Sequence, residues 1–343
     1  MMMLPHRFLA FLIIPMLCPL ACRADQAPAT QPEAAGVETC LAAASDDTPI
    51  YASDKFPPAR EMNATFRLGS AQAAELEFSW VAVDVGDAAP PNFTIASSTL
   101  DLHNVSSGTM SMNGMEQPMP LGKYRLDVSL DHQPWKSVSF SIVPAPDAPS
   151  VPTPQDLMPL VPGKKWTYRF VQEVANGAGL SGPGIKLDPD GKLRATVQIT
   201  EAGDDDKGSH LEMRRNGQLV FEEWWRLTPD GLVSTQRKTS DAIIPMKPPQ
   251  ILWPFPPQPK TWTYDPDDHT YSQTYQMWGP LPVDSPDGPV PGYVVMIDQS
   301  DALSKTSVER HFIPGIGLAR EIIIMSINHK MVSRTEMTLE KME

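Results

Sequence analysis

The sequence predicts an all-β protein, with a β-sandwich followed by a larger antiparallel curved sheet or half-barrel. Proline supplies 37 of the 343 residues, about twice the usual share of roughly 5%. Because proline is excluded from helix interiors and central strands, this content favours short strands, turns and extended linkers. Apolar and polar residues alternate in runs such as 76–83 and 124–130, which is typical of strands with one buried face. Asn-Gly and Asp-Gly pairs between such runs favour tight antiparallel turns.

The N-terminus has the features of an export signal. His6 and Arg7 precede an apolar run at residues 8–20, which is too short for an ordinary membrane-spanning helix. Two processing routes remain open: cleavage after Ala24, or acylation of Cys22, because residues 20–22 resemble a bacterial lipobox with proline in place of its first leucine. Cleavage after Ala24 predicts a signal peptide at residues 1–24, whereas acylation would make Cys22 the new N-terminus. Both routes predict an exported protein of the periplasm or outer cell envelope. If Cys22 is acylated, its lipid anchors the protein to a membrane.

Cysteine usage and net charge exclude several classes of function. The three cysteines are Cys18, Cys22 and Cys40, so the predicted domains contain no disulfide, thiolate nucleophile or cysteine-based metal site. The formal net charge is −13. An acidic surface repels phosphate backbones, and nucleic-acid binding is therefore not expected.

Composition divides the chain into segments. Residues 25–54 are rich in Ala, Pro, Thr and acidic residues without apolar periodicity, and we interpret them as a flexible tether. Residues 55–143 form the first predicted domain. Alternating prolines at residues 144–155 predict an extended linker. The second predicted domain spans residues 156–343.

The first domain is predicted to be a β-sandwich. Residues 64–68, 76–83, 124–130 and 138–142 alternate in polarity and show no helical period. Short strands with this spacing are typical of sandwich folds.

The second domain contains hairpin signals and an internal repeat. Asn216-Gly217 and Asp230-Gly231 each separate two strand-like runs, which predicts a meander of neighbouring strands. Residues 162–168 and 257–264 share a Lys-x-Trp-Thr-Tyr pattern that follows a proline-containing turn. We expect the two copies to begin the two halves of one curved sheet, with Trp166 and Trp262 as core anchors.

Three motifs carry a resemblance to known bacterial proteins. The Trp-Thr-Tyr segments at 162–168 and 253–264, followed by Phe-Ile-Pro-Gly-Ile-Gly-Leu at 312–318, look like the C-terminal part of uncharacterised exported lipoproteins, including planctomycete-like ones. More distantly, the pattern is similar to the half-open β-barrels of periplasmic lipoprotein carriers. Residues 121–142 resemble the end of bacterial immunoglobulin-like modules. The resemblance implies a fold and an exported location, and it implies no activity.

A methionine-rich stretch is the candidate metal site. His103 is followed by Met110, Met112, Met115 and Met119. Thioethers are soft ligands that suit Cu(I). Methionine also fills irregular gaps in hydrophobic cores, and both interpretations remain open.

Aromatic residues of the second domain are the candidate ligand site. Trp224 and Trp225 are adjacent, so they point to opposite faces of a strand. Together with Tyr271 and Tyr275 they could line a concave face that holds an apolar or glycan ligand. The alternative is that they belong to the core.

No catalytic motif accompanies these features. Ser209-His210 and Glu309-Arg310-His311 lie in alternating segments, where neighbouring side chains face opposite ways. A hydrolase would require a structure that brings His210 or His311 beside a carboxylate and a hydroxyl in one cleft. The sequence therefore predicts a non-enzymatic envelope protein with a binding or structural role and no cofactor. Copper binding is the first alternative, and hydrolysis ranks behind it.

Overall fold

The computed structural model describes residues 35–44, 47–113, 115–175, 187–239, 242–269, 271–300, 304–327 and 330–343. These residues form strands, with two short 3-10 turns at Gly86–Ala88 and Pro154–Asp156 and no α-helix in the described ranges. No helix in this part of the chain is long and apolar enough to cross a membrane. The predicted all-β class is confirmed. The predicted signal peptide and Cys22 lie outside the described residues.

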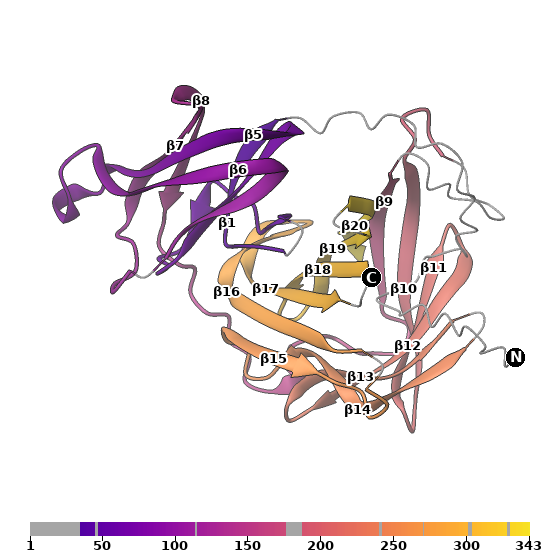
Figure 1. Cartoon of the computed structure of the whole chain (residues 1–343). Helices are drawn as coiled ribbons and strands as arrows, with labels where there is room; N and C mark the ends of the chain where they lie inside the picture. Colours follow the sequence, from indigo (N-terminus) through magenta and orange to yellow (C-terminus); the bar gives the residue numbers. More distant parts are fainter. Residues whose placement is uncertain are drawn as a thin grey trace, which may run out of the picture.

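The first domain is one curled sheet built around two long strands. β5 (Met62–Asp84) pairs along its length with β6 (Phe93–Met112). On its other edge, β5 pairs first with β1 (Gly36–Cys40) and then with β7 (Gly122–Leu130). The sheet continues through β8 (Gln133–Ile142) to the two-residue strand β4 (Lys55–Phe56). An immunoglobulin-like sandwich has two facing sheets, so the expected likeness to such modules is not found (Figure 1).

The predicted tether at 25–54 is wrong from residue 36 onward. This segment contains β1, and β2 (Ala42–Ala43) pairs with β3 (Pro49–Ile50). Cys40 and Ile50 are buried in this segment. The strands are two to five residues long, too short to produce a recognisable period, yet their apolar residues are enough to pack.

The second domain is a twelve-stranded antiparallel sheet that curls into a nearly closed barrel, as predicted. It consists of two six-stranded meanders, β9 to β14 and β15 to β20, joined by pairing of β9 with β20. The first meander contains β9 (Lys165–Val174), β10 (Leu193–Asp205), β11 (Gly208–Arg215), β12 (Gln218–Thr228), β13 (Gly231–Lys238) and β14 (Ile243–Pro254). The second contains β15 (Lys260–Tyr264), β16 (Gln273–Ser285), β17 (Gly288–Ser300), β18 (Ser304–Ile313), β19 (Gly317–Ile327) and β20 (Lys330–Met342).

The internal repeat begins each meander. Trp166 lies in β9 at the centre of the sheet, and Trp262 lies in β15 at one edge. β14 and β15 are the two ends of the strand order, and we call the gap between them the open seam. The Trp262 indole nitrogen donates a 3.3 Å hydrogen bond across it to the Ile251 carbonyl.

The interior of the second sheet is filled by its own side chains. Trp166, Tyr168 and Trp253 are fully buried there, and Trp253 stacks on Phe312 with ring centroids 4.8 Å apart. Leu157, which follows the Pro154–Asp156 turn, is buried in the same core. A cavity of about 20 Å³ remains beside Glu223, Arg310 and Glu321, enough space for about one water molecule.

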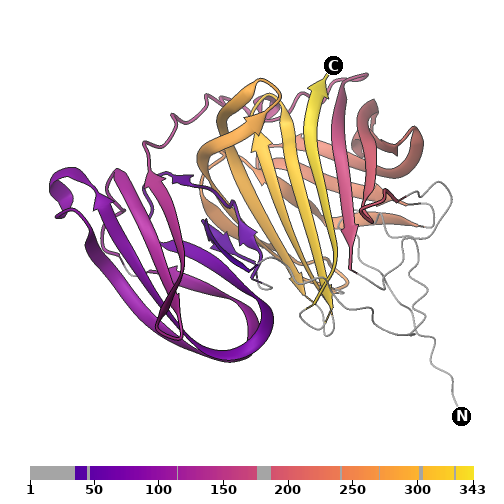
Figure 2. The same ribbon diagram turned by 90° about the horizontal axis from the view of Figure 1, so that it is seen from above.

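The first domain packs on the outer face of the second sheet. Six buried residues of the second domain belong to the first domain's core: Leu281, Val283, Val294, Met296, Ile313 and Ala319. They come from β16 to β19. Residues 36–44 and 47–55, which we call the N-terminal segment, lie between the two curled sheets (Figure 2). A cleft is formed there.

Candidate functional site: the cleft between the two sheets

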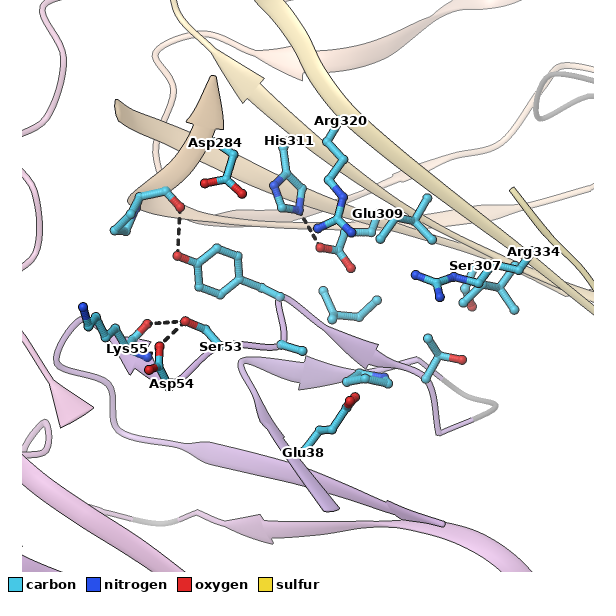
Figure 3. Close-up of a pocket in the computed structure, with 18 of the residues that line it drawn as sticks. Glu38, Ser53, Asp54, Lys55, Asp284, Ser307, Glu309, His311, Arg320 and Arg334 are labelled. Atoms are coloured by element: carbon cyan, nitrogen blue, oxygen red, sulfur yellow. Dashed lines mark hydrogen bonds and ion pairs between the residues drawn. The ribbon is translucent and has the colours of Figure 1, made fainter. Parts of the chain in front are cut away.

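A cleft of about 630 Å³ lies between the N-terminal segment and the outer face of β18, β19 and β20 (Figure 3). Small-molecule sites commonly have volumes of roughly 300–1,000 Å³ and are frequent between domains. The cleft is therefore the candidate functional site.

The floor of the cleft carries a polar stripe along one strand. Ser307, Glu309 and His311 alternate along β18 and line the cleft. Val308 and Phe312 point the other way, into the interior of the sheet. Each of the three stripe residues is at most 5% exposed. Since buried polar groups are costly unless they are hydrogen-bonded, their partners are informative.

His311 and Glu309 form a pair at the centre of the stripe. The His311 Nε2 atom lies 2.5 Å from Glu309 Oε1, and both side chains are buried. The Tyr51 ring lies over this pair from the opposite wall, with its centroid 6.0 Å from that of His311. Burial, followed by the charges of Asp284 and Glu309, raises the pKa of Tyr51 to about 12. Its phenol is therefore neutral at physiological pH and donates a hydrogen bond to the Pro282 carbonyl.

Both signs of charge line the cleft. Arg320 Nη2 and Arg334 Nη2 lie 2.8 and 3.4 Å from the two oxygens of the single carboxylate of Glu336. Glu38 and Asp284 also line the cleft, Glu38 from β1 and Asp284 from β16. Such walls offer hydrogen-bond donors and acceptors, and they suit a polar ligand.

The cleft brings a histidine beside a carboxylate, which the hydrolase alternative required, but the hydroxyls of Ser307 and Tyr51 are engaged elsewhere. Ser307 Oγ donates a 2.7 Å hydrogen bond to Asp298, and Glu309 stands between Ser307 and His311 on the strand. The Tyr51 hydroxyl donates to Pro282. A nucleophile must lie within hydrogen-bond reach of its base, and neither hydroxyl is bonded to His311 in the described cleft.

The other histidine named by the sequence lies outside this cleft. His210 Nε2 is 2.9 Å from Glu222 Oε2. Its ring stacks on Trp224 with centroids 4.3 Å apart. The Trp224 indole donates to Asp205, so this cluster is held by its own contacts.

Cys40, close to the cleft, does not supply a thiolate. The side chain is fully buried. Burial raises the pKa of its thiol to about 12, and the neutral thiol is a poor nucleophile.

The structure separates the four predicted ligand residues. Trp225 and Tyr275 are buried in the interior of the second sheet, and Tyr271 packs against that core. Trp224 points to the other side, against His210. The space beside Trp225 is about 20 Å³, because side chains of the second sheet fill the interior around it. A ligand site on the concave face stays a prediction.

The predicted copper ligands divide into four methionines of one core and an exposed histidine. Met110, Met112 and Met119 are buried in the first core, and Met115 packs against it. His103 is exposed on β6. The positions of the thioethers fit the packing interpretation, and copper binding stays a prediction.

Sequence reasoning missed Ser307 and Tyr51. The sequence shows polar residues at every second position from 307 to 311, but it does not show what covers them. Tyr51 lies within the predicted tether, so no pattern in the sequence connected it with His311.

Comparisons with known proteins give limited guidance. No protein-family model matches the chain, and no curated protein matches it. A protein from Bacteroides fragilis, considered to be exported and to have a YmcC-like fold, is 11% identical, with a TM-score of 0.24 over 53% of this chain and 96% of that one. A protein considered to be a lipoprotein, from Parabacteroides distasonis, is 10% identical, with a TM-score of 0.27 over 57% of this chain and 100% of that one. Neither of these two proteins is from a planctomycete.

Proposed function

We propose that the chain is an exported, non-enzymatic protein of the bacterial envelope that binds a small polar ligand in the cleft between its two sheets. Export is supported by the signal-like residues 1–24 and the lipobox-like segment ending at Cys22. Binding is supported by one observation above all: a cleft of about 630 Å³ whose floor is a buried stripe of polar side chains.

The walls favour a ligand rich in hydroxyl groups. Carboxylates such as Glu38 accept hydrogen bonds from hydroxyls, and guanidinium groups such as Arg334 donate to them. The Tyr51 ring also lines the cleft, where it is buried against His311. We therefore propose a glycan fragment as the ligand, in the cleft instead of on the concave face. A wholly apolar ligand would leave these charges desolvated.

The proposal is tested with the exported protein purified from the envelope. Native mass spectrometry against a panel of envelope glycan fragments and lipids should show a retained glycan. Arg334→Gln and Glu38→Gln, which alter opposite walls of the cleft, should weaken the complex by about tenfold or more. Each lost charged hydrogen bond costs roughly 1.5–3 kcal/mol.

A matched control keeps the test specific. Arg194 forms ion pairs with Asp188 and Asp190 and is half-exposed, and it does not line the cleft. Arg194→Gln should leave the glycan complex unchanged. Retention of no glycan by the wild-type protein, or equal losses in all three variants, would contradict the proposed site.

The anchor is tested separately. Replacing Cys22 with serine removes the thiol that would carry the lipid. If Cys22 is acylated, fractionation should move the protein from the membrane to the soluble envelope fraction. An unchanged distribution would favour cleavage after Ala24.

A further inference from the structure

A second cluster of ligand-type side chains lies on the outer face of the first sheet, away from the cleft. It consists of Glu75 and Glu77 on β5 and His132 in the turn between β7 and β8. One donor atom from each residue lies within 4.8 Å of the other two. Nothing in the proposed function uses these residues.

The fold holds the three side chains in place by separate means. Glu75 and Glu77 are two positions apart on a strand, so they share one face, and Leu76 between them is buried on the other. The turn is fixed to β5 by two hydrogen bonds. Asp131 N donates to Glu75 O at 2.8 Å, and Glu75 N donates to Asp131 Oδ1 at 2.9 Å. These bonds place His132 beside the two glutamates.

A fourth carboxylate lies next to this group. Asp101 on β6 is the register partner of Glu75, and directly opposed residues point to the same face of a sheet with Cβ atoms roughly 5 Å apart. Asp101 is exposed, so its side chain is able to turn toward the cluster.

We propose that Glu75, Glu77 and His132 bind a zinc ion, with Asp101 or water in the fourth position. The imidazole decides the class of metal, because calcium and magnesium take oxygen ligands, whereas zinc accepts nitrogen and carboxylate oxygen together. Cu(I) prefers thioethers and thiolates, and none is among these ligands.

The distances fit a tetrahedral ion. Zinc bonds to nitrogen and oxygen of roughly 2.0–2.2 Å place neighbouring ligand atoms roughly 3.3–3.6 Å apart. His132 Nδ1 lies 2.8 Å from Glu77 Oε1 and 3.5 Å from Glu75 Oε1. The His132–Glu75 distance already lies in this range, and the His132–Glu77 distance must lengthen by about 0.5–0.8 Å to reach it. The half-exposed glutamates and the exposed histidine have room for such side-chain adjustments.

The test is calorimetric titration of zinc chloride into the metal-stripped, full-length mature protein. We expect a strong site with a stoichiometry of one. His132→Asn should weaken that site by at least about tenfold, since it removes a direct ligand. Asparagine tolerates the positive φ of 62° at this position. Glu77→Gln preserves the side-chain shape, and it should have a similar effect.

Two controls distinguish a zinc site from an acidic patch or a simple ion pair. His269 is another exposed histidine beside a carboxylate, with its Nδ1 atom 3.7 Å from Asp265, and His269→Asn should leave the zinc affinity unchanged. Calcium chloride should bind far more weakly than zinc. Zinc affinity unchanged in His132→Asn, equal loss in His269→Asn, or calcium binding as strong as zinc binding would overturn the proposal.

Discussion

The Tyr51 hydroxyl donates a 2.9 Å hydrogen bond to the Pro282 carbonyl, which lies 231 residues later in the chain. Tyr51 belongs to the N-terminal segment, and Pro282 lies in β16 of the second sheet. The bond therefore connects the N-terminal segment to the second sheet, beside the His311–Glu309 pair.

Tyr51→Phe should destabilise the protein by about 1 kcal/mol. The substitution keeps the ring against His311 but leaves the Pro282 carbonyl without this donor, and a typical hydrogen bond contributes about that much. Urea unfolding followed by tryptophan fluorescence measures the change. An unaltered midpoint would show that the bond does not hold the segment in place.

Stability should fall on acidification because of a buried ion pair inside the second sheet. Burial alone would raise the pKa of Glu223, but Arg237 and a hydrogen bond from Ser234 outweigh it, so that pKa lies below its ordinary 4.5. The stabilisation is therefore present above about pH 4.5 and is lost as the pH falls through the lower folded-state pKa. The free energy of unfolding, measured across this range, should fall less steeply in Glu223→Gln than in the wild-type protein.

The methionine-rich stretch should act as core. Met110 is 1% exposed, so Met110→Ser should cost about 3 kcal/mol or more through the lost burial and the buried hydroxyl. His103→Ser, at an exposed position of the same strand, should change stability by less than about 0.5 kcal/mol. Equal effects in a urea titration would contradict the packing interpretation.

Copper binding requires its own measurement. Cu(I) should bind equally well to the wild-type protein and to a variant with serine at Met110, Met112, Met115 and Met119, provided that the variant is folded by circular dichroism. A folded variant that binds Cu(I) more weakly than the wild-type protein would favour the copper alternative.

The two repeat tryptophans should differ in importance. Trp166 is fully buried, and its indole donates a 2.7 Å hydrogen bond to the Ile316 carbonyl. Trp262 is only partly buried and lies on an edge strand. Trp166→Ala should cost about 4 kcal/mol, and Trp262→Ala should cost distinctly less. Equal shifts of the thermal midpoint would show that the two tryptophans contribute equally to stability, which would contradict this prediction.

The sequence predicted the parts of the fold that depend on local signals. Alternation and the turn at Asn216-Gly217, where φ is positive at both residues, correctly predicted the hairpin of β11 and β12. The repeat correctly indicated two halves of one sheet. The curl of the first sheet was not predictable, because it depends on β1 and β7 sharing one edge of β5, and this pairing leaves no periodic signal.

The cleft was beyond sequence reasoning for a different reason. His311 and Glu309 are near neighbours in the sequence, but their place in the cleft depends on Tyr51, whose ring packs against His311. The sequence predicted Trp225 and Tyr275 as ligand contacts because aromatic side chains occur both in cores and in binding sites. Composition does not distinguish the two uses, and only the packed interior does so.

The pairing of β9 with β20 has a consequence for how the chain folds. It pairs Trp166 with Met342. The ladder therefore joins the first and the last strands of the second sheet in sequence order. All other ladders of that sheet connect consecutive strands, so each can form soon after its second strand is available. The β9–β20 ladder cannot form until almost the whole domain has been synthesised, and contacts between such distant segments slow folding. The second sheet therefore acquires its curvature last, and a chain that lacks β20 would retain two meanders without the strand pair that unites them.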